Sequence, residues 1–112
     1  MNRFEILSDL IAFSKPVDEL KKNLSNFDWD YEGPPLVIMA TQIQDVLRRF
    51  LAGEFTAEDL ENWANLLECR EDLEFEEGKS EEIENVIYCL ANPTLQKEIT
   101  IDSCKEFLIS LI

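Results

Sequence analysis

The sequence predicts an all-α protein: a single compact bundle of about six helices that spans residues 1–112. Apolar residues recur at three- and four-residue spacings through most of the chain, which is the pattern of amphipathic helices with one buried face. Glycine (3) and proline (4) are scarce, and this disfavours a turn-rich all-β fold. A hydrophobic fraction of 46% over 112 residues is enough to build one core without disulfides or metals.

Two helices are predicted in the first 27 residues. The apolar face of the first consists of Phe4, Leu7, Leu10 and Ile11. Pro16 interrupts this pattern and suits the first turn of a second helix, because an N–H at that position would have no partner within the helix. The apolar face of the second helix consists of Val17, Leu20, Leu24 and Phe27.

Residues 28–35, DWDYEGPP, are predicted to form a loop, since a Gly-Pro-Pro sequence cannot continue a helix. A long helix follows, with an apolar seam of Leu36, Met39, Ile43, Val46, Leu47, Phe50 and Leu51. A short strand over Leu36–Met39 is the alternative, but the periodicity downstream favours helix, with this first turn buried on every side. Gly53 is expected to end the helix in a left-handed conformation. Arg48 and Arg49 are interpreted as its solvated face, with a docking pair as the alternative.

The next helix has a clear start signal. Thr56 is a predicted N-cap, and Asp59 three residues later completes a variant of the capping box. The inward face of this helix consists of Leu60, Trp63, Ala64 and Leu67. Trp63 is therefore predicted to lie in the core.

Two further helices complete the predicted bundle. Residues 70–78, REDLEFEEG, are too charged for the core, and only Leu73 and Phe75 could anchor them. The next helix is expected to begin at a Ser80 N-cap and to end at Asn92-Pro93. The apolar stripe of that helix is Ile83, Val86, Ile87 and Leu90. The last helix is expected to begin near Thr100 and to align Ile101, Cys104, Phe107, Leu108 and Leu111.

The negative charge is concentrated in one part of the chain. Residues 54–84 contain thirteen acidic and two basic residues and so carry −11 of the net charge of −14. This repulsion destabilises a compact state, which suggests an electrostatic docking face for a basic protein; a solvated surface that aids solubility is the alternative. The same charge disfavours nucleic acid or an anionic membrane as a direct ligand.

Several function classes are not supported by the sequence. Histidine is absent, and no P-loop, nucleophile elbow, dinucleotide-binding turn or EF-hand loop is present, so we expect neither catalysis nor a metal or other cofactor. Cys69, Cys89 and Cys104 are widely spaced and are expected to be reduced thiols packed as small apolar groups. No export signal or membrane-spanning stretch is evident, so a cytoplasmic location is expected.

A resemblance gives the charge a specific interpretation. The runs that carry it are DWDYEGPPLVIMATQIQDVLRRFLAGEFTAEDLENWANLLECREDLEFE and VIYCLANPTL, and the most characteristic pieces are RFLAGE, WAN and LANP. They resemble small bacterial immunity proteins of polymorphic toxins, including those of contact-dependent growth inhibition systems. The resemblance covers roughly residues 28–95 and implies a protein that binds and blocks the toxin domain of a sibling cell. Many such toxins are nucleases with cationic clefts, which an acidic helical protein would complement.

The predicted partner-binding residues rest on charge and exposure. They are Asp28, Trp29, Asp30, Tyr31, Glu71, Asp72, Glu74, Glu76 and Glu77. Trp29 and Tyr31 have an alternative place inside the bundle, where they would pin the loop. Two other functions compete with immunity. One is a DNA-mimic protein that blocks a host nucleic-acid-binding protein through acids spaced along an elongated surface. The other is a non-catalytic adaptor subunit that uses the apolar C-terminal helix as its contact.

Overall fold

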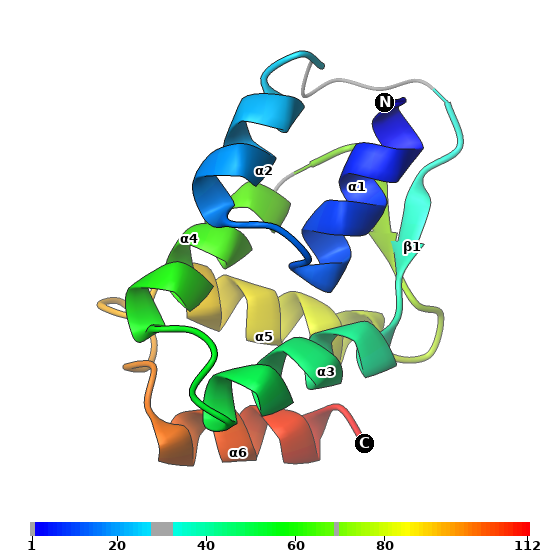
Figure 1. Cartoon of the computed structure of the whole chain (residues 1–112). Helices are drawn as coiled ribbons and strands as arrows, with labels where there is room; N and C mark the ends of the chain where they lie inside the picture. The colour runs from blue at the N-terminus through cyan, green and yellow to red at the C-terminus, as the bar shows by residue number, and fades with distance from the viewer. Residues whose placement is uncertain (1, 28–32, 69) are drawn as a thin grey trace.

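The computed structural model describes residues 2–27, 33–68 and 70–112, and it contains six helices and two short strands in those ranges (Figure 1). In chain order they are α1 (Arg3–Ala12), α2 (Val17–Leu24), β1 (Leu36–Ile38), α3 (Ala40–Leu51), α4 (Ala57–Leu67), β2 (Leu73–Phe75), α5 (Ser80–Ala91) and α6 (Ile101–Ser110). The predicted all-α class and the six helices are confirmed. Strand β1 was the alternative left open for Leu36–Met39, and β2 is an addition.

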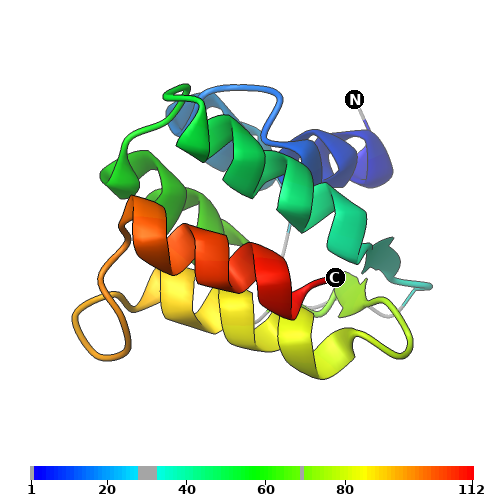
Figure 2. The same ribbon diagram turned by 90° about the horizontal axis from the view of Figure 1, so that it is seen from below.

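The helices enclose one connected core. Helix α4 packs along α5, α1 packs against α2, α3 and α4, and α6 packs against α3. Viewed from below, α6 lies between α3 and α5 (Figure 2). Trp63 of α4 is completely buried, as predicted, and its indole Nε1–H donates a hydrogen bond to the carbonyl of Leu10 at 2.6 Å. No helix within the described ranges has the length and apolar character that a bilayer crossing requires.

The local helix signals were predicted well in the middle of the chain. Gly53 adopts φ +89° directly after the end of α3, and its N–H donates to the carbonyl of Phe50 while that of Glu54 donates to Arg49. This is a Schellman motif, which satisfies carbonyls at the helix end. Thr56 and Asp59 exchange side-chain to backbone hydrogen bonds of 3.0 Å in the predicted capping box at the start of α4.

Other local expectations were wrong. Ser80 is the first residue of α5 rather than its cap, and Lys79, which precedes it, makes no side-chain capping hydrogen bond. Phe4 and Ile101 are 40% and 57% exposed instead of buried. Each lies in the first turn of its helix, where a side chain points back past the helix end and beyond the packed region.

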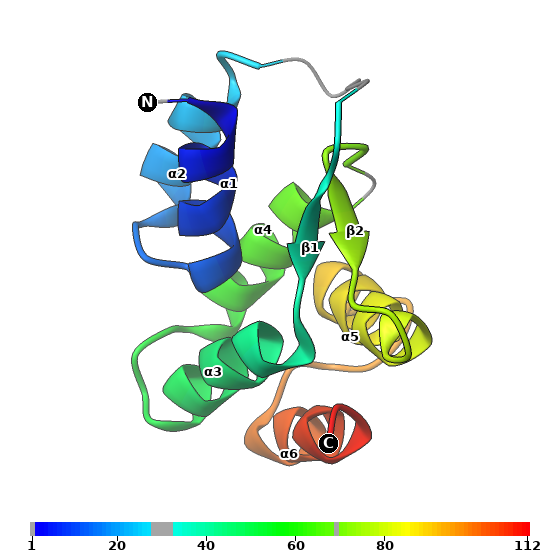
Figure 3. The same cartoon turned by 90° about the vertical axis from the view of Figure 1, so that its right-hand side faces the viewer.

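The start of the third predicted helix is a strand. Leu36–Ile38 form β1, which pairs in parallel with β2 in the register Leu36 to Leu73 and Ile38 to Phe75 (Figure 3). The expectation of helix over Leu36–Met39, buried on every side, was therefore wrong: Val37 is 37% exposed. β-branched residues favour strands, and here a partner strand from a distant part of the chain is present. Helical periodicity in the downstream residues carries no information about that partner.

Candidate functional site

The predicted contact residues fall into two groups in the structure. Asp28, Trp29, Asp30 and Tyr31 lie outside the described residues. The remaining five lie in β2 or within two residues of its ends. Three of them have exposed side chains, namely Glu71, Glu74 and Glu77. The exposure on which the prediction depended therefore holds for these three glutamates.

Asp72 is not a surface residue, and its assignment as a contact was wrong. Its side chain is fully buried, and its two carboxylate oxygens accept hydrogen bonds of 2.9 Å from Nε and Nη2 of Arg70. A nitrogen of Arg3 lies 3.6 Å from the same carboxylate. Two cations compensate the buried negative charge, so Asp72 holds the turn before β2 instead of meeting a partner. The expectation that only Leu73 and Phe75 of residues 70–78 could reach the core was therefore wrong for Arg70 and Asp72, while Leu73 is buried as allowed.

Glu76 also has a structural role. It is half-buried, and its Oε1 accepts a hydrogen bond of 2.8 Å from the backbone N–H of Ala40, the first residue of α3. A carboxylate at a helix N-terminus satisfies an otherwise unpaired donor and complements the helix dipole. Glu76 thus connects the end of β2 to the start of α3, and replacing it would disturb both.

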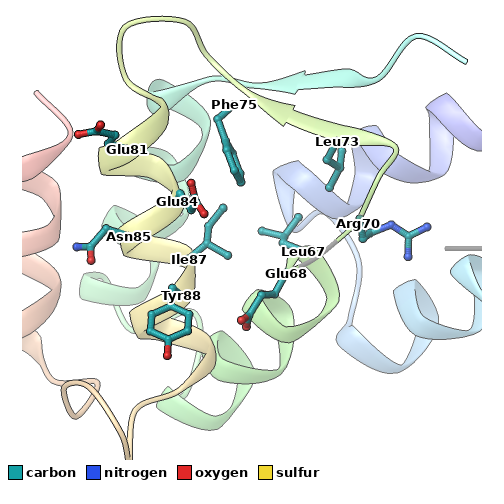
Figure 4. Close-up of a pocket in the computed structure, with 10 residues that line it drawn as sticks. All are labelled: Leu67, Glu68, Arg70, Leu73, Phe75, Glu81, Glu84, Asn85, Ile87 and Tyr88. Carbon is teal, nitrogen blue, oxygen red and sulfur yellow. The ribbon is translucent and has the colours of Figure 1, made fainter. Parts of the chain in front are cut away.

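A groove lies beside β2, between this strand, the end of α4 and α5 (Figure 4). Its volume is about 650 Å³. The side chains of Leu73 and Phe75 point from β2 into the groove, and Leu67 of α4 and Ile87 of α5 complete its apolar lining. The groove is therefore a concave apolar surface close to Glu74 of β2 and to the exposed glutamates that flank this strand.

The rim of the groove is acidic. Glu68 follows α4, and Glu81 and Glu84 come from α5. Arg70 is the one cation among the described residues that line the groove, and its guanidinium is bonded to Asp72. The sequence analysis did not single out these three glutamates or Tyr88, which is 42% exposed at the same rim. For Glu81, Glu84 and Tyr88 the sequence does carry a signal, because spacings of three and four residues place them on one face of α5. Glu68 follows α4 and has no such signal.

The two cysteines that the structure describes contribute no reactive group to this surface. Cys89 and Cys104 are free and buried, as predicted, while Cys69 lies outside the described residues. Burial raises the pKa of the Cys89 thiol, with a smaller opposing effect of Lys97, and raises that of Cys104 to about 11. Within the described part of the chain, no three cysteine or carboxylate side chains are grouped so that they could hold a metal ion.

Comparison with protein-family models, curated proteins and solved structures finds no match for this chain. The function is therefore argued from the residues and the geometry around β2.

Proposed function

We propose that this protein is an immunity protein, which binds a bacterial toxin domain with a basic surface and neutralises it. The observation that carries the proposal is the concentration of charge: residues 54–84 hold −11 of the net −14. Glu71, Glu74 and Glu77 are exposed within that stretch, and Glu68, Glu81 and Glu84 border the neighbouring groove. A surface of one charge sign steers an oppositely charged partner and raises its association rate.

The resemblance of residues 28–95 to immunity proteins of polymorphic toxins supports the same function. An acidic inhibitor suits a toxin that binds nucleic acid, because the cleft for the phosphate backbone must be cationic. We therefore propose a nuclease domain as the partner. The inhibitor acts by binding alone, without catalysis or a cofactor, in the cytoplasm of the cell that it protects.

The shape of the molecule favours this proposal over the DNA mimic. The described chain measures 37 × 31 × 24 Å along its principal axes, so it is compact, whereas mimicry of a duplex calls for an elongated acidic surface. For the adaptor, Leu111 is buried at 1% exposure, but Ile109 and Ile112 are 71% and 79% exposed, so the C-terminal end keeps the apolar surface that this alternative would use.

Co-expression tests the proposal directly. The C-terminal domain encoded by the neighbouring gene is expressed in cells with and without this protein, and growth is scored. We expect growth arrest by that domain alone and rescue by co-expression. Arrest in both cases, with both proteins soluble and at equal levels, would rule out immunity against that toxin and would direct the search to basic proteins captured from extract.

A further inference from the structure

One edge of β2 has no partner strand in the described part of the chain. The N–H of Leu36 donates to the carbonyl of Asp72, and the N–H of Glu76 donates to the carbonyl of Ile38, each at 2.9 Å. In a parallel pair, alternate residues of a strand turn both backbone groups to the same neighbour. Residues 72, 74 and 76 therefore face β1, and the N–H and C=O groups of Leu73 and Phe75 face the open edge.

This open edge runs along the groove. Figure 3 shows β2 as the outer strand of the pair, next to α5, and Figure 4 shows the side chains of Leu73 and Phe75 directed into the groove. A strand added at this edge would place every second side chain on the groove side of the sheet. The open backbone groups would supply affinity and the apolar groove would supply selectivity, as in other cases of strand addition.

The charge around the edge specifies the occupant. Glu74 is exposed on the opposite face of β2, where it would lie beside the remaining side chains of an added strand, and Glu68 and Glu84 lie at the rim of the groove. Opposite charges on neighbouring strands stabilise a sheet and like charges destabilise it. Pairing with the same edge of a second copy would bring two acidic strands together, so a basic segment of another protein is the matching partner.

We propose that an extended segment of the partner adds to β2 as a third strand. Its apolar side chains enter the groove over Phe75 and Ile87, and its alternating lysine or arginine side chains lie on the face of Glu74. The acidic rim of the groove attracts the basic segment as a whole. The inference rests on the proposed function, since it names the kind of toxin segment that the protein would hold.

The test uses a seven-residue peptide of alternating lysine and valine with the ¹⁵N-labelled protein. We expect saturable shifts of the Leu73 and Phe75 amides and slower hydrogen exchange at both. Two N-methylated versions of the peptide, one methylated at the valines and one at the lysines, carry the same charge. Because alternate residues of a strand point their N–H groups to opposite sides, only one of the two versions loses the N–H groups that face β2. That one should bind at least about tenfold more weakly, since its hydrogen bonds to the strand are lost. Equal affinities of the two versions, shifts spread over other acidic helices, or no binding at millimolar peptide would overturn the inference.

A pair of charge-reversal variants provides the control. The double variant Glu74→Lys and Glu84→Lys should weaken peptide binding several-fold. The control, Asp45→Lys and Glu106→Lys, makes the same change in net charge on α3 and α6. Its change in the logarithm of the dissociation constant should be less than half as large. Equal losses would mean binding to overall charge and would overturn the inference. The peptide titration needs no toxin, and the growth test needs no knowledge of the contact. Rescue of growth without peptide binding at the edge would support the immunity function and reject the strand-addition site. Peptide binding at the edge without rescue would support the strand-addition site and reject immunity against that toxin.

Discussion

The carboxylate of Asp72 and the guanidinium of Arg70 form a two-point ion pair, with both N–O distances at 2.9 Å and both side chains buried. The pair spans only two residues, so it closes the turn from which β2 departs. The carbonyl of Asp72 also accepts the N–H of Leu36, which links this turn to β1. Two charges that seemed part of a solvated acidic run therefore define where the strand pair begins.

Removal of one partner of this pair should be costly. We expect Asp72→Ala to lower the free energy of unfolding by about 3–5 kcal/mol, because the Arg70 guanidinium would stay buried without its carboxylate. Urea unfolding monitored by circular dichroism measures the loss. The neighbouring Glu71→Ala, at an exposed site, should change stability by less than about 0.5 kcal/mol. Equal effects of the two variants would contradict the structural role of Asp72.

Truncation of Trp63 should also destabilise the fold. Its side chain is fully buried, and its ring lies 5.6 Å from that of Phe13 in a stacked arrangement. We expect Trp63→Ala to reduce stability by roughly 3–5 kcal/mol through loss of burial and formation of a cavity. Trp63→Phe, which keeps a ring but loses the hydrogen bond to Leu10, should cost clearly less. An unchanged melting temperature for the alanine variant would be incompatible with a core position.

Arg49 and Arg48 should behave differently, although the sequence suggested that both lie on a solvated face. Arg49 donates to the carbonyls of Ala12 and Phe13 at 2.8 and 3.1 Å, and its guanidinium lies 4.7 Å from the centre of the Phe55 ring. Phe13 has φ +49° and needs such support. Arg49→Ala should therefore cost roughly 2 kcal/mol, whereas Arg48→Ala should be near neutral. The melting temperatures of the two variants test this difference. Similar melting temperatures would refute a structural role that Arg49 has and Arg48 lacks.

Stability should depend on alkaline pH through Cys104. Burial raises the thiol pKa from 9.0 to about 11, so the folded state favours the protonated form. This contribution is complete below pH 9 and is lost as pH rises from 9 towards 11, because only the unfolded chain then releases the proton. We expect a loss of about 2–3 kcal/mol over that interval, which Cys104→Ala lacks. Urea unfolding of both proteins at pH 8 and pH 11 measures it, and parallel pH dependences would exclude Cys104 as the source.

Reversal of the exposed charges around β2 should slow toxin binding. A triple variant at three of the predicted contacts, Glu74, Glu76 and Glu77, would confuse binding with folding because Glu76 caps α3. We therefore choose Glu71→Lys, Glu74→Lys and Glu77→Lys, and expect an association rate at least about tenfold lower at low salt, with a flatter salt dependence.

The control for this variant is Asp45→Lys, Glu98→Lys and Glu106→Lys, which makes the same change in net charge at exposed sites elsewhere. Stopped-flow association with the toxin domain at several salt concentrations compares the two. An equal decrease in both variants would show that net charge, and not the surface around β2, steers the partner.

The predictions from sequence succeeded where the signal is local. Gly53 ends a helix because its own backbone permits a positive φ, and Thr56 caps α4 through a residue three positions away. They failed where the deciding partner is distant. The strand at Leu36–Ile38 requires Leu73–Phe75, and the buried carboxylate of Asp72 lies 3.6 Å from a nitrogen of Arg3, at the other end of the chain. The apolar lining of the groove combines residues from α4, β2 and α5. The concentration of charge in the sequence therefore indicated the region around β2 but could not predict the groove itself.

The parallel pairing of β1 with β2 also has a kinetic consequence. Helices α3 and α4 lie between the two strands in the chain, so the pair can close only after a long loop has been brought together. Contacts that form late are absent from the folding transition state, and weakening them accelerates unfolding while leaving the folding rate nearly unchanged. We therefore expect substitutions that weaken the pairing of β2 to shorten the lifetime of the native protein, in the same residues that border the proposed docking groove.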